Sequence, residues 1–242
     1  FGAVIKYIPD PVIVGFTSGI AVIIWVGQWK DFFGLKPAPG AEHFHEKIWD
    51  LAVAFPSLHL ETTLMALLTL LLVIYSPRVL KRIPSPLVAM IAATVIQASF
   101  EFKGVATIGS AFGGIPQSLP SFEFLPIRFS QVLQLIGPAF TIALLGAIES
   151  LLSAVVADSM TGSKHDSNQE LVGQGIANIF SPLFGGFAST GAIARTATNI
   201  RNGATSPLAG IVHTLTLLII VLVFAPLAAH IPLCALSAIL FV

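Results

Sequence analysis

Glu149 and Arg195 are charged residues that lie among apolar and small neighbours in the sequence. Inside the hydrocarbon of a bilayer, an ionised carboxylate costs about 2.5 kcal/mol or more unless it meets a partner or a water-filled cavity. A glutamate in a membrane-spanning segment therefore indicates ion binding or proton transfer. Two structural alternatives stay open: a buried Glu149 without a chemical role, and an Arg195–Glu149 ion pair that only stabilises the fold.

Arg195 lies in a short helical segment, residues 191–199. The glycines at 185–186 end the preceding helix, and Ser189 or Thr190 can cap the next one. The segment is about 14 Å long, roughly half of the hydrocarbon thickness. Its first N–H groups have no acceptor within the helix, and its dipole adds partial positive charge. This end predicts an anion site of the kind that broken helices form in transporters, and Arg195 strengthens it.

Small residues form one stripe of the apolar segment 131–157, which also holds Glu149. At 100° per residue they fall on one side of a helix, with Glu149 at the edge of that side. Small side chains let a second backbone approach closely, so the stripe predicts either a packing contact alone or the wall of a site. The stripe comprises Ala143, Gly146, Ala147, Ser150, Ser153, Ala154 and Ala157.

The composition places these residues in a membrane protein. Of 242 residues, 55% are apolar and 10% are charged, whereas soluble domains carry about 25% charged residues. The mean hydropathy is +0.89. The formal net charge is zero, which removes the electrostatic case for binding nucleic acid, and the single Cys234 excludes a disulfide within the chain. We therefore predict an all-α polytopic membrane protein with roughly six to eight spans of about 20 residues.

Apolar stretches alternate with connections rich in Pro and Gly, which predicts the order of the helices. Two long connections, 31–61 and 101–130, separate them, the second with strand-like segments at 105–108. The first residue is Phe1 and the last residues end within an apolar stretch, so we expect an internal piece of a longer protein. The expected helical segments are 12–26, 62–75, 86–100, 131–157, 171–187, 191–199, 206–229 and one that begins at Pro232.

Cations in the short connections predict the orientation of the chain. If the expected spans alternate across the bilayer, one side collects the cations of the short connections. The other side collects those of the two long connections, which also hold more acidic residues. The first side is therefore expected to be cytoplasmic. Its cations are Lys6, Arg78, Lys81, Arg82, Lys164 and Arg201, and those of the opposite side are Lys30, Lys36, Lys47, Lys103 and Arg128.

Other polar groups give weaker signals. His165 and Asp166 are expected to cap a helix in a short connection. The sequence has no Gly-rich phosphate-binding loop followed by Lys and Ser or Thr, and no serine in the context of a protease nucleophile, so neither ATP-driven transport nor an enzyme is expected. A further cluster matches no zinc-ligand spacing, so we expect a solvated loop and no metal site. That cluster is Glu42, His43, His45 and Glu46.

The most recognisable runs of sequence lie between residues 146 and 207. They are AIESLLSAVVAD (147–158), GSKH (162–165), NQELVGQG (168–175) and AIAR (192–195). Upstream, GFTSG (15–19) and KDFFGL (30–35) belong to the same pattern. Over essentially the whole chain, this pattern resembles the sulfate permease (SulP) family of anion transporters. Within that family it is most similar to the bacterial branch associated with C4-dicarboxylate uptake.

The resemblance implies a fragment of a transporter built from two inverted repeats of seven spans, with a gate domain and a core domain. Residues 1–130 would be gate-type helices that end the first repeat. Residues 131–231 would be core-type helices with a broken half-helix near 189–199, and residues 232–242 would start the next gate helix. The STAS domain that commonly follows the last span would lie outside this chain. The family also implies a homodimer and, for a bacterial member, the cell inner membrane.

Carried over position by position, the resemblance also assigns substrate-binding residues. Sodium-coupled bicarbonate members have Asp at the position of Glu149 and threonine at that of Ile193, and they lack Arg195. Ile193 offers no hydroxyl ligand for sodium, and a glutamate paired with an arginine, Glu149 with Arg195, fits proton coupling better. We therefore expect Glu149 to carry a coupling proton, with no cofactor beyond the proton motive force. The assigned substrate-binding residues are Glu149, Ser153, Gly191, Ala192, Ile193 and Arg195.

Two hypotheses of different class follow from the residues and the resemblance. The first is a secondary active transporter, coupled to protons, that takes up sulfate or a C4-dicarboxylate by alternating access with an elevator-like movement of the core. The second is a passive anion channel, or an exchanger for bicarbonate or chloride. Only active coupling requires a titratable group at the site, and Glu149 supplies one.

Overall fold

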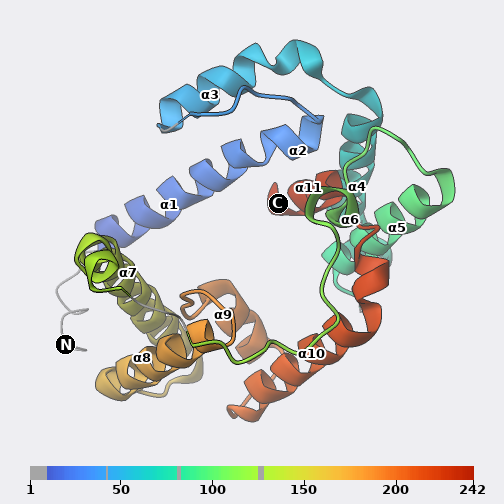
Figure 1. Ribbon diagram of the computed structural model, residues 1–242. Helices are drawn as coiled ribbons and strands as arrows, with labels where there is room; N and C mark the ends of the chain where they lie inside the picture. The colour runs from blue at the N-terminus through green and yellow to red at the C-terminus, as the bar shows by residue number, and fades with distance from the viewer. Residues whose placement is uncertain (1–9, 42, 81–82, 125–127) are drawn as a thin grey trace. The chain divides into compact units, whose positions relative to one another are not determined.

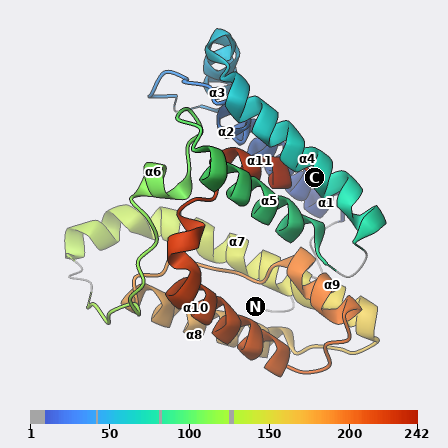
Figure 2. The ribbon, with the colours of Figure 1, turned by 90° about the vertical axis from the view of Figure 1, so that its right-hand side faces the viewer.

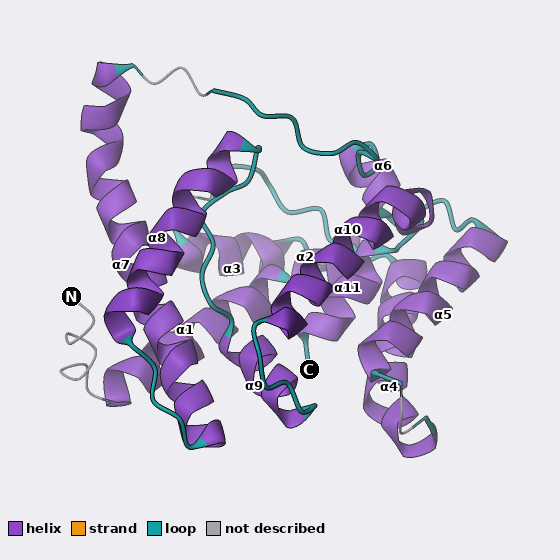
Figure 3. Cartoon of the chain, turned by 90° about the horizontal axis from the view of Figure 1, so that it is seen from below, coloured by secondary structure: helices purple, strands orange, loops and turns teal. Residues whose placement is uncertain are grey.

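The computed structural model describes residues 10–41, 43–80, 83–124 and 128–242 (Figure 1). Every regular element in these ranges is a helix, as Figure 3 shows, which confirms the all-α prediction for the described residues. Four charged residues used in the sequence analysis lie outside these ranges. They are Lys6, Glu42, Lys81 and Arg82.

The helices follow the apolar stretches in the expected order, with shifted boundaries. Residues 31–61 contain helix α3 and most of α2, both too short to span a membrane. The helix expected at 171–187 begins and ends four residues earlier, and the one expected at 191–199 begins two residues later. The helices are α1 (Asp10–Gly27), α2 (Trp29–Phe33), α3 (Phe44–Val53), α4 (Leu60–Val79), α5 (Ser85–Phe100), α6 (Ile108–Phe112), α7 (Phe129–Thr161), α8 (Ser167–Leu183), α9 (Ile193–Arg201), α10 (Leu208–Ala228) and α11 (Leu233–Leu240), with a 3-10 turn η2 (Phe55–Ser57).

The chain divides into two compact units, which are described separately. The first unit comprises Phe1–Val12 and Ser118–Leu217, and so contains α7, α8 and α9. The second unit comprises Ile13–Gln117 and Leu218–Val242, and so contains α4, α5 and α11. The division into gate-type and core-type helices stays a prediction.

In the second unit, α4 and α5 form a helical hairpin, and α11 packs against both of them (Figure 2). Ala66 of α4, Ala93 of α5 and Ala235 of α11 are each at most 1% exposed. Alanines at these contacts let the helix axes approach closely, as in membrane helix packing. Threonines add no unpaired polar group, because the Thr69 hydroxyl donates to the carbonyl of Met65, 2.8 Å away.

The polar connection before α4 folds back onto this hairpin. Phe32 of α2 stacks on Phe241, with ring centroids 4.5 Å apart. Gly34 ends α2 with φ of +64°, and a Cβ there would stand 2.8 Å from the Cβ of His59. Only glycine combines this left-handed backbone with so close an approach. His59 in turn caps α4, since its ring accepts from the N–H of Thr62.

Residues 101–117 connect to α11 through backbone contacts. The predicted strand-like segment at 105–108 forms one isolated antiparallel bridge, between Thr107 and Pro232, instead of a strand. Leu233 N–H donates to the Ala106 carbonyl over 2.9 Å, and Ile108 N–H donates to the Ile231 carbonyl over 3.0 Å. The pairing stops there because α6 begins at Ile108.

In the first unit, α7 and α8 form a second hairpin. Asp166 caps α8 by accepting from the N–H groups of Asn168 and Gln169, which confirms the predicted capping role and sets the earlier start of α8. His165 lies 2.7 Å from Asp158 (Nδ1 to Oδ2) and so joins the connection to the end of α7. These contacts fix how α8 leaves α7.

Three of the described helices are long and apolar enough to cross a membrane: α4, α7 and α10. The apolar helix α5 is shorter, with 16 residues. Many large apolar side chains of these helices are exposed, including Leu71, Phe140 and Ile219. Such surfaces are stable in lipid, where backbone groups are satisfied within each helix and apolar side chains face the hydrocarbon.

Candidate functional site

The connection between α8 and α9 reverses sharply and runs back beside α8. Gly185 has φ of +72°, which suits a glycine at the end of a helix. The Gly186 N–H donates to the Ser181 carbonyl over 2.9 Å, and the Ser181 hydroxyl donates to the Phe187 carbonyl over 3.2 Å. This turn returns the following residues to the middle of α8.

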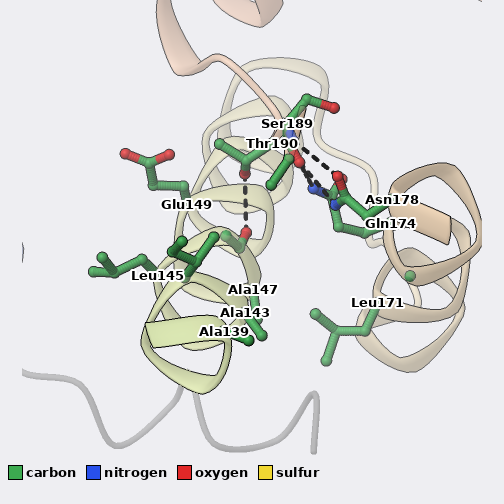
Figure 4. Close-up of a pocket in the computed structure, with 14 residues that line it drawn as sticks. Ala139, Ala143, Leu145, Ala147, Glu149, Leu171, Gln174, Asn178, Ser189 and Thr190 are labelled. Atoms are coloured by element: carbon green, nitrogen blue, oxygen red, sulfur yellow. Dashed lines mark hydrogen bonds between the residues drawn. The ribbon is translucent and has the colours of Figure 1, made fainter. Parts of the chain in front are cut away.

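Two amide side chains of α8 bind the backbone of Ser189 (Figure 4). Asn178 donates from Nδ2 to the Ser189 carbonyl over 2.9 Å and accepts from the Ser189 N–H through Oδ1 over 2.8 Å. Gln174, one turn earlier on α8, donates to the same carbonyl. Ser189 is therefore held through both of its backbone polar groups.

The next two residues are held by α7. The Thr190 hydroxyl donates to the Gly146 carbonyl over 2.9 Å and lies 2.9 Å from the Ser150 hydroxyl. Since a hydroxyl has one hydrogen, Ser150 is the donor in this second contact. The Gly191 N–H then donates to Ser150 Oγ over 3.1 Å. Residues 189–191 thus form a short extended bridge that is bonded to α8 on one residue and to α7 on the next two.

The small-residue stripe of α7 lies where this bridge and α9 approach. A Cβ on Gly191 would stand 3.3 Å from the Ser153 Cβ and 3.4 Å from the Ser150 Cα, so a larger residue would fit only if its neighbours moved. In the first turn of α9, the Thr196 hydroxyl lies 2.7 Å from the Ser153 hydroxyl. The prediction that small residues admit a second backbone is confirmed.

Helix α9 begins at Ile193, with Ala192 as its N-cap. The expectation that Ser189 or Thr190 caps this helix is wrong, because both are engaged by α8 and α7. The first bond of the helix runs from Thr196 N–H to the Ala192 carbonyl, 2.9 Å. Within the described ranges, the N–H groups of residues 192–195 have no acceptor, whereas the Gly191 N–H does. The free donors therefore start one residue later than the sequence predicts.

A cavity of about 730 Å³ lies beside the bridge. Its walls are α7 between Ala139 and Glu149, α8 between Leu171 and Asn178, and residues 188–190. Most of the lining is apolar, with polar groups at Glu149 and at the amides of Gln174 and Asn178. In Figure 4 the Glu149 carboxylate points away from these two amides.

The structure separates the predicted site residues into two groups. Glu149 lines the cavity and is half-buried. Ser153 and Gly191 lie in the contact between α7 and α9, next to the start of α9 that Ala192 and Ile193 form. Arg195 is exposed on the first turn of α9.

The expected ion pair between Arg195 and Glu149 is not formed in the structure, whereas His165 and Asp158 do form an ion pair. Glu149 lies on α7 and Arg195 on α9, and spacing in the sequence cannot show whether side chains of two helices meet.

Sequence reasoning missed the two amides that hold the bridge. Gln174 and Asn178 are four residues apart on α8 and so share one face, which is a signal that the sequence does offer. Ser150 and Thr190 were predicted as a stripe residue and a possible cap, but their mutual contact was not predicted because it joins residues 40 apart. In the part of the chain that the structure describes, no three His, Cys, Asp or Glu side chains gather where they could hold a metal ion.

Comparison with known families gives a match to the Sulfate permease family over residues 1–242. The chain belongs to the sulfate permease family. This is a family of transporters and not of enzymes. The bridge and the start of α9 therefore lie in a protein whose relatives carry anions across membranes.

Three relatives show how far the likeness extends. YvdB of Bacillus subtilis (strain 168), whose name describes a sulfate transporter, is 47% identical over 241 residues, covering 100% of this chain and 46% of YvdB. Bicarbonate transporter BicA of Picosynechococcus sp. (strain ATCC 27264 / PCC 7002 / PR-6) is 37% identical, covering 99% of this chain and 42% of BicA. The solved transmembrane domain of a cyanobacterial BicA superposes with a TM-score of 0.85 at 34% identity, covering 98% of this chain and 59% of that domain. The chain thus spans less than half the length of YvdB or of the first BicA.

Proposed function

We propose that this chain is part of a secondary active transporter that takes up sulfate or a C4-dicarboxylate together with protons. The anion binds at the N-terminus of α9, and core-type helices move relative to gate-type helices to give alternating access. The family match and the name of YvdB support sulfate as the anion. The observation that carries the proposal is the set of N–H groups at residues 192–195, which have no acceptor among the described residues.

These N–H groups suit an anion for two reasons. They carry the partial positive charge of the helix terminus, and they are fixed before the anion arrives because α7 and α8 hold the preceding bridge. A prepositioned donor does not lose ordering entropy when it binds. Arg195 adds a full positive charge within the first turn, and it favours divalent anions because Coulomb energy scales with the product of the charges.

Glu149 is proposed as the group that carries the coupling proton. It is half-buried in a cavity wall that is mostly apolar, and in the described residues no cation pairs with it. A carboxyl group in such a place can take up and release a proton without a change of charge on the apolar side chains around it.

Flux into proteoliposomes that contain the whole protein tests this function. With sulfate or succinate outside, an inward proton gradient is expected to drive accumulation above the equilibrium level, and collapse of the gradient by a protonophore is expected to remove it. Uptake that only equilibrates the anion, with or without a gradient, would contradict proton coupling.

One specific observation favours a second candidate, a bicarbonate or chloride exchanger or a passive channel. The transmembrane domain of BicA superposes on 98% of the chain at a TM-score of 0.85. This candidate predicts that bicarbonate or chloride competes with sulfate at equal concentration and that the flux follows the anion gradient alone. A homodimer in the bacterial inner membrane is proposed for either candidate.

The orientation of the second unit is proposed from its cations, with Arg78 on the cytoplasmic side and residues 31–61 outside. Ser57→Cys is expected to react with an impermeant thiol reagent in intact cells, and Ser85→Cys to react only after lysis. Cys234 is buried and so adds little background. Labelling of Ser85→Cys but not Ser57→Cys in intact cells would reverse the orientation.

A further inference from the structure

The amides of Gln174 and Asn178 border the cavity, yet they bind protein backbone. Asn178 accepts one hydrogen bond from the Ser189 N–H and donates another to the Ser189 carbonyl. Gln174 spends an N–H on the Ser189 carbonyl. A single residue of the connection thus receives three side-chain hydrogen bonds, which is far more than a solvent-exposed loop residue requires.

Ser189 lies three residues before Ala192, where the free N–H groups of α9 begin. Between them, Thr190 and Gly191 are bonded to α7. The connection therefore has no free residue between the α8 contact and the α7 contact. When the α8 contact is lost, only the bonds of Thr190, Gly191 and Thr196 to α7 hold the start of α9, so the conformation that presents its first N–H groups is populated less.

We propose that Asn178 and Gln174 are positioning residues of the anion site: by binding the backbone of Ser189 they fix the N-terminus of α9. This inference rests on the anion site proposed above. It adds the residues that keep the N–H groups of α9 in the conformation that binds the anion. The two amides raise the population of this binding-competent conformation and do not contact the anion themselves.

This role predicts a particular change in transport kinetics for Asn178→Ala. When the competent conformation is populated only fractionally, the apparent affinity falls by that fraction, and saturating anion restores the conformation. The KM for sulfate is therefore expected to rise about tenfold while the maximal rate per protein in the membrane stays within about twofold. The KM for chloride is expected to rise by the same factor, since α9 presents the same donors to both anions.

Gln174→Ala removes one of the three bonds, so its KM is expected to rise about threefold. If Asn178→Ala does not reach the membrane, the KM of Gln174→Ala tests the positioning role by itself. Gln169→Ala is the matched control, because Gln169 is an exposed amide on the same helix. Proteoliposomes with equal amounts of each protein give both kinetic constants.

Three outcomes overturn the proposal. An unchanged KM in both variants removes the positioning role, and a lower maximal rate with unchanged KM shows that the bonds only support folding. A sulfate KM that rises while the chloride KM stays constant makes the amides direct ligands. Failure of the proposed function looks different, because the unmodified protein then shows no accumulation of sulfate driven by a proton gradient.

Discussion

The two units hold their helices together with different contacts. In the second unit, α4, α5 and α11 meet through apolar side chains and alanines that are almost completely buried. In the first unit, the described residues of α8 and α9 include none that is buried, and hydroxyl and amide groups attach residues 189–196 to α7 and α8. Apolar contacts are non-directional, whereas a hydrogen bond constrains direction as well as distance. The second unit is therefore built for stability and the first for the placement of a backbone segment.

Gly191→Val is expected to have the largest effect, because the first unit depends on close placement. A Cβ at this position already stands 3.3 Å from the Ser153 Cβ, and the two methyl groups of valine need more room. The bridge must shift, and a misplacement of about 1 Å can cost about 100-fold in rate. Initial sulfate flux in proteoliposomes measures the loss. Gly173→Val is the control, since its Cβ meets nothing within 4 Å. If Gly191→Val keeps the full sulfate flux, the close contact at Gly191 is not required for transport.

Glu149→Gln is expected to abolish accumulation driven by a pH gradient while exchange of internal for external anion remains. Glutamine has a similar shape to glutamic acid but cannot release a proton. Counterflow and gradient-driven uptake, measured on the same vesicles, separate the two activities. Glu170→Gln is the matched control, because Glu170 is an exposed carboxylate in the first turn of α8. Unaltered pH dependence in Glu149→Gln would exclude this carboxyl as the proton carrier.

Arg195→Ala is expected to discriminate between anions by charge. Because Coulomb energy scales with the product of charges, a threefold loss of affinity for chloride corresponds to about a tenfold loss for sulfate. Arg195→Lys keeps the charge without the planar fork and should lie between. Arg201→Ala, in the last turn of the same helix, is the control. Equal losses for both anions would show that Arg195 does not select substrate charge.

Ala93→Leu is expected to have the smallest effect on transport, because it acts on the apolar contacts of the second unit. Ala93 is 1% exposed between α5 and its neighbours, so the added carbons overpack the contact and lower the free energy of unfolding by about 1–3 kcal/mol. A thermal-shift measurement in detergent should show a lower Tm, with the KM for sulfate unchanged. Val95→Leu, at an exposed position of α5, should leave both quantities as they are. A changed KM in Ala93→Leu would show that the apolar contacts of the second unit also affect anion binding.

Local patterns predicted most helices because apolar length and helix-ending residues act over short distances. The α4–α5 hairpin, the long α7 and the capping of α8 by Asp166 all follow from such patterns. The start of α9 was misplaced because Ser189 and Thr190, good capping residues by type, bind α8 and α7 instead. That competition depends on a chain reversal that no periodicity reveals.

The candidate site was predictable in its location more than in its contacts. The small-residue stripe correctly marked where a second backbone meets α7, and Glu149 does line a cavity. The predicted ion pair between Glu149 and Arg195 was wrong. Two residues assigned to the same site do not have to contact each other. Gln174 and Asn178 stand on one helical face, but only the folded connection shows what they bind.

The length of α7 has a consequence for movement within a bilayer. The helix has 33 residues, and Glu149 is its only charge between Arg128 and Asp158. That stretch is about 44 Å long at 1.5 Å per residue, whereas the hydrocarbon layer is about 30 Å thick. The distance between the two terminal charges therefore exceeds the hydrocarbon thickness by roughly 14 Å. The helix can be displaced along the membrane normal by several Å before the charge at either end must leave water.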